Sequence, residues 1–170
     1  GMAMNALAQG LKEVVDFDYL SYRINQVKTL GDLLTEKGIP IVLPAGGHAI
    51  FIDGRKFYPN IPIDQFPAQY LCCALYECGG IRPVEVGANL ADRDPDTGEN
   101  IIPKLDLCRL AIPRRSYSYE HIKYIAETVF EVFQGAKNIT TGLEFDFESE
   151  GIRHFSSTFK TIDKNKKTLL

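Results

Sequence analysis

The chain has 170 residues, of which 45% are hydrophobic and 24% are charged, and its formal net charge is -3 at pH 7. These values predict one folded domain with its own core and argue against a disordered or collagen-like chain. The small negative charge provides no extended cationic surface, so we expect no nucleic-acid partner and no binding to an anionic membrane.

Two helices are predicted at the start of the chain. Apolar residues recur at helical spacing over residues 5–15 and again over residues 18–37. Gly38 follows where a left-handed cap residue is wanted, so the second helix should end there. We therefore expect a helical entry segment over residues 1–37, whose long helix packs on a sheet, and an α/β small domain over residues 38–162.

A hairpin and a further helix are predicted next. Residues 39–43 and 48–53 are typical of short strands, and a Pro-Ala-Gly-Gly turn signal lies between them. Asp64 is a suitable N-cap for a helix that ends at Gly79 and the glycine after it. Residues 81–86 are then predicted to form another strand.

Arg109 lies in the next predicted strand, residues 105–112, which follows a loop rich in turn-forming residues at 89–103. Alternation places Arg109 on the same face as Leu107, and we expect this face to be buried. A buried guanidinium needs an anionic partner. The sequence allows two kinds: a substrate carboxylate, which the arginine fork binds in a bidentate manner, or an internal ion pair with a residue such as Glu85.

The C-terminal part begins with a predicted long helix capped by Ser118. Residues 142–148 alternate apolar and acidic side chains, as a half-solvated strand does, and Phe155 and Phe159 are expected to continue the sheet. The charged tail, 163–170, is expected to fray. The order of elements predicts an α/β fold of the α+β two-layer type, with helices packed on one mixed, largely antiparallel sheet.

Histidines and acidic residues offer few self-contained sites. His48 follows a glycine pair and fits either a site loop or a hairpin turn, and His121 fits a helix cap. The alternating carboxylates of residues 92–96 lack the rest of a calcium loop, so no metal site is predicted. His154, next to an arginine and a phenylalanine, fits either the lining of an interface cleft or a structural position.

The sequence also suggests a cellular context. The longest uncharged apolar stretch, residues 39–52, is interrupted by prolines and glycines and is shorter than the roughly 20 residues of a membrane-spanning helix. The first residues show no basic region followed by an apolar run, so a cytoplasmic protein is expected. The four cysteines lack the spacing of a zinc site and are predicted to be reduced thiols.

Seven segments occur in an order that strongly resembles the C-terminal part of the β-eliminating lyases, the pyridoxal-phosphate enzymes that include tryptophanase and tyrosine phenol-lyase. The segments are YRINQV (22–27), GGHA (46–49), DQFPAQ (64–69), GIRPVEVG (80–87), RDPDTG (93–98), RLAIPR (109–114) and RHF (153–155). The resemblance extends over nearly the whole chain.

The resemblance implies the small domain of a fold-type I enzyme, which packs against a larger cofactor domain, in the same chain or in a second one, and closes over the substrate. Arg109 matches the family arginine that binds the amino-acid carboxylate. Tyrosine phenol-lyases carry arginine at the position of Val86 and phenylalanine at that of His154, so both positions resemble tryptophanase. The implied reaction converts L-tryptophan and water into indole, pyruvate and ammonia, with Val86 beside the substrate and His154 in a catalytic polar network.

The resemblance also implies where the cofactor binds. The family's Schiff-base lysine, its pyridinium-pairing aspartate, its phosphate loop and its monovalent-cation ligands belong to the larger domain. Pyridoxal phosphate is therefore expected in the full-length enzyme and not on this chain alone, which we expect to be inactive. Because the isolated chain would leave a sheet face uncovered, it could also form a homodimer. The alternative is a stand-alone, non-catalytic module that binds an amino-acid or other carboxylate ligand through Arg109.

Overall fold

The computed structural model describes residues 1–163 and 169. Its α-helices are α1 (Met2–Glu13), α2 (Phe17–Glu36), α3 (Gly54–Phe57), α4 (Pro67–Gly79), α5 (Tyr119–Gly135) and α6 (Arg153–Ser156). Its strands are β1 (Ala49–Asp53), β2 (Val84–Val86), β3 (Leu107–Ala111), β4 (Leu143–Phe147) and β5 (Thr158–Thr161). Two short 3-10 helices, η1 (Ile63–Gln65) and η2 (Ala136–Asn138), complete the set.

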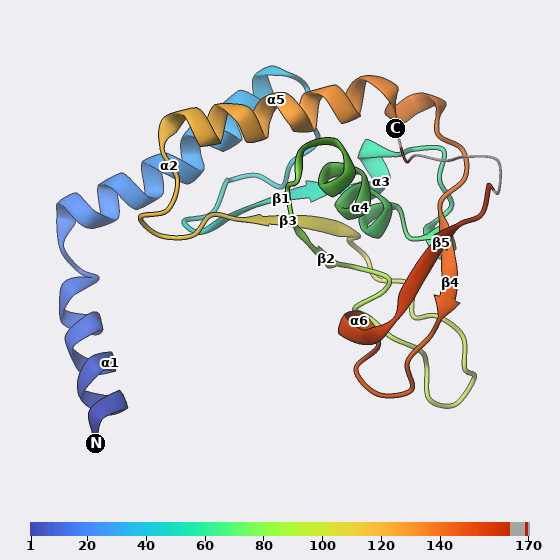
Figure 1. Ribbon diagram of the computed structural model, residues 1–170, viewed down its shortest axis with the longest axis horizontal. Helices are drawn as coiled ribbons and strands as arrows, with labels where there is room; N and C mark the ends of the chain where they lie inside the picture. The colour runs from blue at the N-terminus through green and yellow to red at the C-terminus, as the bar shows by residue number, and fades with distance from the viewer. Residues whose placement is uncertain (164–168, 170) are drawn as a thin grey trace.

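The core lies between a three-stranded antiparallel sheet, in the order β1-β3-β2, and the helices on one of its faces. On that face Ile50, Ile52, Cys108 and Leu110 are buried. Helices α2 and α5 run along this side of the sheet, and α4 packs against β2 and β3 (Figure 1). The apolar stripes of these helices and the buried strand residues form one hydrophobic cluster.

The opposite face of the same sheet is left open by the described chain, and we call it the open face. Strand pairing sets Arg109 in the centre, opposite Phe51 of β1 and Val84 of β2, and sets Val86 opposite Leu107. Directly opposed residues of an antiparallel pair project to the same side. These five residues are half-buried or exposed, and the helices α2, α4 and α5 lie on the other side (Figure 1).

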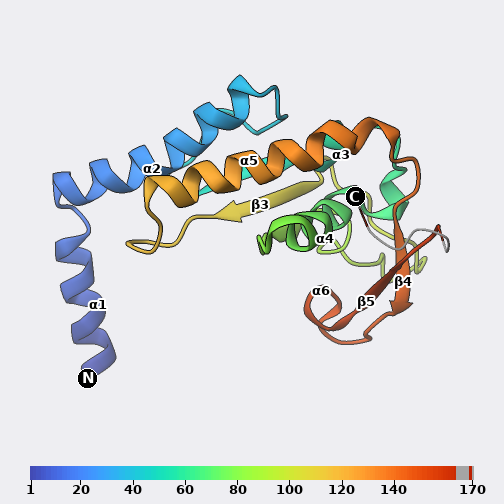
Figure 2. The ribbon, with the colours of Figure 1, turned by 45° about the horizontal axis from the view of Figure 1, so that its top comes forward.

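A second, two-stranded antiparallel sheet of β4 and β5 lies beyond the end of α4, with α6 beside it (Figure 2). Phe145 and Phe159 pack on each other, with ring centroids 4.6 Å apart, and both meet the edge of the Phe66 ring. This aromatic cluster packs the small sheet against Phe66, and Leu143 of β4 extends into the main hydrophobic cluster.

The α+β fold class is confirmed, but the single mixed sheet is wrong: the described residues form two sheets, and the strands of both pair antiparallel. Strand β4 finds its apolar partner in Phe159 of β5, so it does not join the larger sheet. Phe155 does not continue a strand and lies in α6. Residues 39–43 form no strand, although Ile41 makes an isolated bridge to Ile52.

Two helix starts show how local chemistry decides boundaries. Ser118 caps α5 as predicted, and the side chain of His121 completes a capping box with it. Asp64 does not cap α4, because it lies in η1 and Phe66 adopts a left-handed conformation at φ 56° before the helix begins at Pro67.

Helix α1 stands apart from this body. It has no buried residue and projects away from the sheet in both ribbon views (Figures 1 and 2). Its apolar residues Met2, Met4, Leu7 and Leu11 are exposed. Packing of the entry segment on the sheet therefore involves α2, which contacts β1, and the boundaries of the predicted domains stay a prediction.

The remaining general expectations concern thiols, the tail and membrane spans. The four cysteines are free thiols, as predicted. Much of the tail 163–170 lies outside the described residues, while Leu169 is held on α4, where its N–H donates to the Glu77 carboxylate at 2.7 Å. None of the helices in the described part of the chain is long and apolar enough to span a bilayer.

Candidate active site

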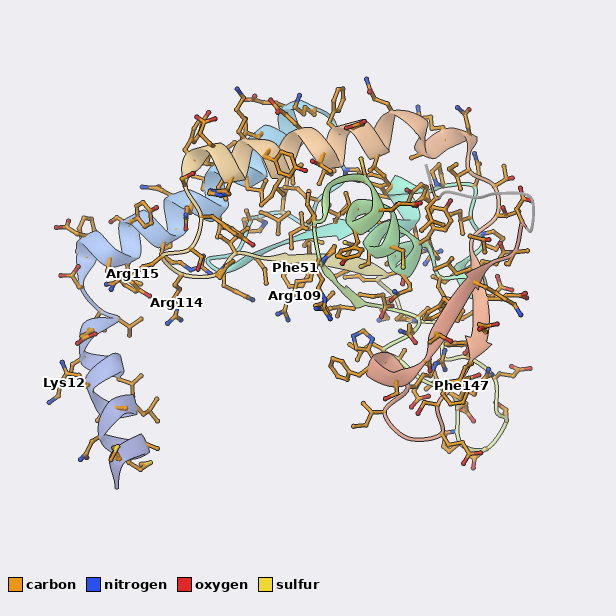
Figure 3. The ribbon with its side chains drawn as sticks, viewed as in Figure 1. Lys12, Phe51, Arg109, Arg114, Arg115 and Phe147 are labelled. Atoms are coloured by element: carbon orange, nitrogen blue, oxygen red, sulfur yellow. The ribbon has the colours of Figure 1, made fainter. Side chains whose placement is uncertain are left out.

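Arg109 projects from the centre of β3 onto the open face, where Figure 3 shows it beside Phe51. Its Nε atom is buried and makes no hydrogen bond. Within residues 1–163 and 169, no carboxylate lies within ion-pair distance of its guanidinium. A planar cation held by a strand and flanked by apolar neighbours is suited to bidentate binding of a carboxylate from outside the described chain.

The expected burial of the Arg109 face is wrong, and so is the alternative ion pair with Glu85. The face that packs on the helices carries Cys108 and Leu110, which flank Arg109 in sequence. Glu85 stands opposite Cys108 in the β2–β3 register, so it points into the core. Since neighbouring positions of a strand face opposite sides, Glu85 and Arg109 are separated by the sheet itself.

Glu85 instead forms a polar cluster with His154 and Asn89. Its carboxylate accepts hydrogen bonds from the backbone N–H groups of Asn89 at 3.0 Å and Leu90 at 3.1 Å. The Nδ1 atom of His154 lies 3.4 Å from Glu85 Oε2 and 3.4 Å from Asn89 Nδ2. Burial raises the pKa of Glu85 to about 7 and lowers the pKa of His154.

A second buried carboxylate, Asp106, holds the chain that leaves β2. It accepts hydrogen bonds from the N–H groups of Ala88 at 3.0 Å and Ala68 at 2.8 Å. Burial raises its pKa, against the effect of these two donors. A Cβ atom on Gly87 would collide with the Asp106 carboxylate, so the turn after β2 requires glycine at this position.

The short helix α6, which carries His154, is attached to the body through Arg153. This side chain is only 3% exposed, donates to Asn100 Oδ1 at 2.8 Å and lies 3.5 Å from Glu148. Its guanidinium also lies over the Phe145 ring at 4.7 Å from the centroid. Sequence reasoning missed this anchor, because Asn100 lies 53 positions away and because no local pattern shows that the residues around Phe145 fold back onto Arg153.

Arg93 gives the same region a second connection. It donates to both carboxylate oxygens of Glu148, at 2.7 and 2.6 Å, and this contact lowers the pKa of Glu148. The loop at 89–103 is therefore fastened to the end of β4, although it was predicted only as an exposed loop.

Strand β2 relates the three predicted site residues to one another. Val86 shares the open face with Arg109, while the preceding residue of the strand, Glu85, carries the contact to His154. No hydrogen bond or ion pair in the described chain joins His154 to Arg109. His48 contributes its backbone carbonyl to Arg23 and its ring to an edge contact with Phe51. Residues 1–163 and 169 contain no group of three potential metal-ligating side chains.

Five of the described lysines, each paired with a carboxylate or an aromatic ring, do not fit the aldehyde anchor of pyridoxal phosphate. An imine-forming lysine is held in a desolvated pocket or beside another cation. Here Lys28, Lys56, Lys123 and Lys160 are solvent-exposed and paired with nearby carboxylates. Lys37 lies over the Phe130 ring on the outside of α2 and α5.

The carboxyl group of Glu85 makes folding depend on pH. Its pKa is about 7 in the folded chain and 4.5 ordinarily, so the folded chain binds this proton more tightly. Glu85 therefore favours folding below pH 4.5 and loses that contribution as the pH rises through 7. Relative to wild type, the free energy of unfolding of Glu85→Gln should rise by about 2 to 3 kcal/mol from pH 5 to 8.

Urea denaturation at a series of pH values measures this difference. His154, whose pKa is lowered by burial, opposes Glu85 on acidification in both proteins, so the comparison cancels its effect to first order. If the free energy of unfolding depended on pH in the same way in wild type and Glu85→Gln, the raised pKa given to Glu85 would be contradicted.

Comparison with known proteins identifies a matching family and several similar enzymes. Residues 9–128 match the family described as beta-eliminating lyase. The tyrosine phenol-lyase of Symbiobacterium thermophilum is 48% identical over 162 residues, and the tryptophanase of Hyphomonas neptunium is 44% identical over 162 residues; each alignment covers 95% of this chain and 35% of the relative. A probable beta-eliminating lyase of Trichomonas vaginalis is 49% identical over 156 residues, 92% of this chain and 34% of the relative.

The chain thus spans about a third of the length of the curated relatives it matches. The matched range includes the three strands that place Arg109 and Val86 on the open face. On this evidence, the chain belongs to the β-eliminating lyase family.

Proposed function

We propose that this chain is the substrate-closing part of a tryptophanase-like, pyridoxal-phosphate-dependent lyase that converts L-tryptophan and water into indole, pyruvate and ammonia. The observation that carries the proposal is Arg109, a guanidinium on the open face with no carboxylate partner in the described chain. A charge-assisted fork of this kind fixes the carboxylate of an amino acid and orients the rest of the substrate.

The choice of indole over phenol rests on Val86 and His154. Val86 extends the apolar part of the open face beside Leu107, where an arginine would bring a charge that has to be desolvated when an apolar ring binds. His154, on α6, supplies a polar group to the indole side of the substrate. The resemblance to tryptophanase at both positions supports this assignment.

The cofactor-bearing part of the lyase is proposed as the partner of the open face, in cis or in trans. The uncovered sheet face and the exposed apolar side of α1 are suited to burial against another folded unit. Since the resemblance assigns the cofactor-binding residues to the larger domain, we propose that the 170 residues alone release no indole. A second copy of the chain is the competing occupant of the open face and would give a homodimer.

A chimeric enzyme tests the proposal. This chain replaces the matching third of the Hyphomonas neptunium tryptophanase, and indole release from L-tryptophan is compared with phenol release from L-tyrosine. We expect a clear preference for L-tryptophan, since the chain supplies Val86 and His154. The isolated chain, given pyridoxal phosphate and L-tryptophan, should release no indole.

The double variant Val86→Arg, His154→Phe is the matched control, because it installs the two residues that the resemblance gives to tyrosine phenol-lyases. It should shift the preference toward L-tyrosine. A folded, cofactor-bound chimera that acts on L-tyrosine and not on L-tryptophan would overturn the substrate assignment. Indole release by the chain alone would overturn the proposal that the cofactor-bearing part of the lyase lies outside these 170 residues.

The second candidate is a non-catalytic carboxylate-binding module, favoured by the same unpartnered Arg109. It predicts that L-tryptophan raises the Tm of the isolated chain and that Arg109→Met abolishes the shift. The lyase proposal expects no such shift in Tm, because the cofactor-bearing part that would cover a ligand on the open face is absent from the isolated chain.

A further inference from the structure

The Nδ1 atom of His154 lies between two groups that require opposite protonation states. Glu85 Oε2 and Asn89 Nδ2 are each 3.4 Å away. An ionised carboxylate only accepts hydrogen bonds, and an amide nitrogen only donates them. Nδ1 therefore satisfies Glu85 when it carries a proton and satisfies Asn89 when it carries a lone pair.

We infer that Glu85 is the positioning residue of His154: its charge selects the ring nitrogen that holds the proton, and thereby decides whether Nε2 donates or accepts a hydrogen bond. With Glu85 ionised, the ring proton on Nδ1 faces the carboxylate across the 3.4 Å ion-pair contact, and Nε2 keeps a lone pair. With Glu85 neutral, Nδ1 accepts from Asn89 or from the carboxyl O–H, and the ring proton sits on Nε2.

The surroundings of Glu85 allow both charge states. Its side chain is fully buried, which favours the neutral form, and the Asp106 carboxylate acts in the same direction. The N–H groups of Asn89 and Leu90 and the charge of Arg153 favour the ionised form. Two buried thiols of the described chain also lie near this cluster, Cys108 directly opposite Glu85 on β3 and Cys72 on α4.

The catalytic meaning of this arrangement rests on the proposed function, whereas the protonation geometry does not. In the lyase, a lone pair on Nε2 is suited to accept a hydrogen bond from the N–H of indole. Glu85 in its ionised form would then set His154 for an indole substrate without touching the substrate itself. Protonation of Glu85 would place the ring proton on Nε2, which would then donate a hydrogen bond instead of accepting one.

Nitrogen NMR of the 170-residue chain, labelled with ¹⁵N-histidine, tests the inference without cofactor or substrate. The three histidines are assigned with His48→Gln and His121→Gln. In the wild type, neutral His154 should carry its proton on Nδ1 above about pH 7 and on Nε2 below it, before the ring becomes cationic. His121 is the internal control, because its Nδ1 accepts a hydrogen bond from the Ser118 N–H at 3.1 Å, a contact that involves no carboxylate.

Glu85→Gln should abolish the exchange and hold the proton on Nε2, since the new amide can donate to Nδ1. Glu144→Gln, at an exposed position of β4, should leave the exchange unchanged. A wild-type ring with its proton on Nε2 throughout the titration would overturn the inference, and so would an exchange that persists in Glu85→Gln. If Glu85→Gln does not fold, the wild-type titration decides alone. Failure of the chimera to release indole would refute the proposed function and leave this result standing.

Discussion

Arg109→Met is expected to lower kcat/KM of the chimeric enzyme for L-tryptophan by about 10²- to 10³-fold. Removing one partner of a desolvated charge pair costs roughly 2 to 5 kcal/mol, because the remaining carboxylate is buried without compensation. The loss should appear mainly in kcat/KM, measured by indole release at low substrate concentration, because the carboxylate contact forms when the substrate binds.

Arg109→Lys separates charge from shape. Lysine keeps the positive charge and loses the planar pair of donors, so its kcat/KM should fall between those of wild type and Arg109→Met. Because Arg109 projects onto the open face and makes no ion pair in the described chain, both variants should unfold within about 0.5 kcal/mol of wild type. An Arg109→Met enzyme with unchanged kcat/KM would contradict the role given to this residue.

Arg153→Met should have the largest effect on stability, a loss of about 3 kcal/mol in the free energy of unfolding. The guanidinium is almost fully buried and serves Asn100, Glu148 and the Phe145 ring together. Methionine fills a similar volume but leaves the Asn100 carbonyl without this donor and weakens the attachment of α6. Urea denaturation measures the loss, and hydrogen exchange should show faster opening of α6, β4 and β5.

Arg93→Met is the matched control for this prediction. Arg93 pairs with the same Glu148, but its side chain is 40% exposed, and ion pairs in contact with solvent contribute at most about 1 kcal/mol. Equal losses for the two variants would mean that burial of Arg153 contributes nothing beyond a surface ion pair.

The long helices could be predicted from the sequence because their apolar stripes extend over several turns, whereas the four-residue helices α3 and α6 were not predicted. Helices α2, α4 and α5 each carry such a stripe, and the glycine after α4 and the capping box of α5 mark their ends. The short strands carry less information. A three-residue strand such as β2 is specified mainly by its neighbours, so its residues alone could not define its bounds.

Arg109 could be found from sequence, but its environment could not. Alternation along β3 separates two faces without saying which one meets the helices, and both faces carry apolar residues such as Leu107 and Leu110. The cluster around His154 could not be predicted from the sequence for another reason. Asn89 and His154 are 65 positions apart, and no local pattern links α6 to the turn after β2.

Strand β2 also has a consequence for how this protein can diverge. Its successive residues belong to different environments: Glu85 points into the core, and Val86 projects from the open face. In a deep mutational scan under selection for folding, position 86 should tolerate large and charged substitutions, and position 85 should tolerate few. Under the proposed function, a new preference for the substrate ring can therefore evolve at position 86 while the interior stays unchanged.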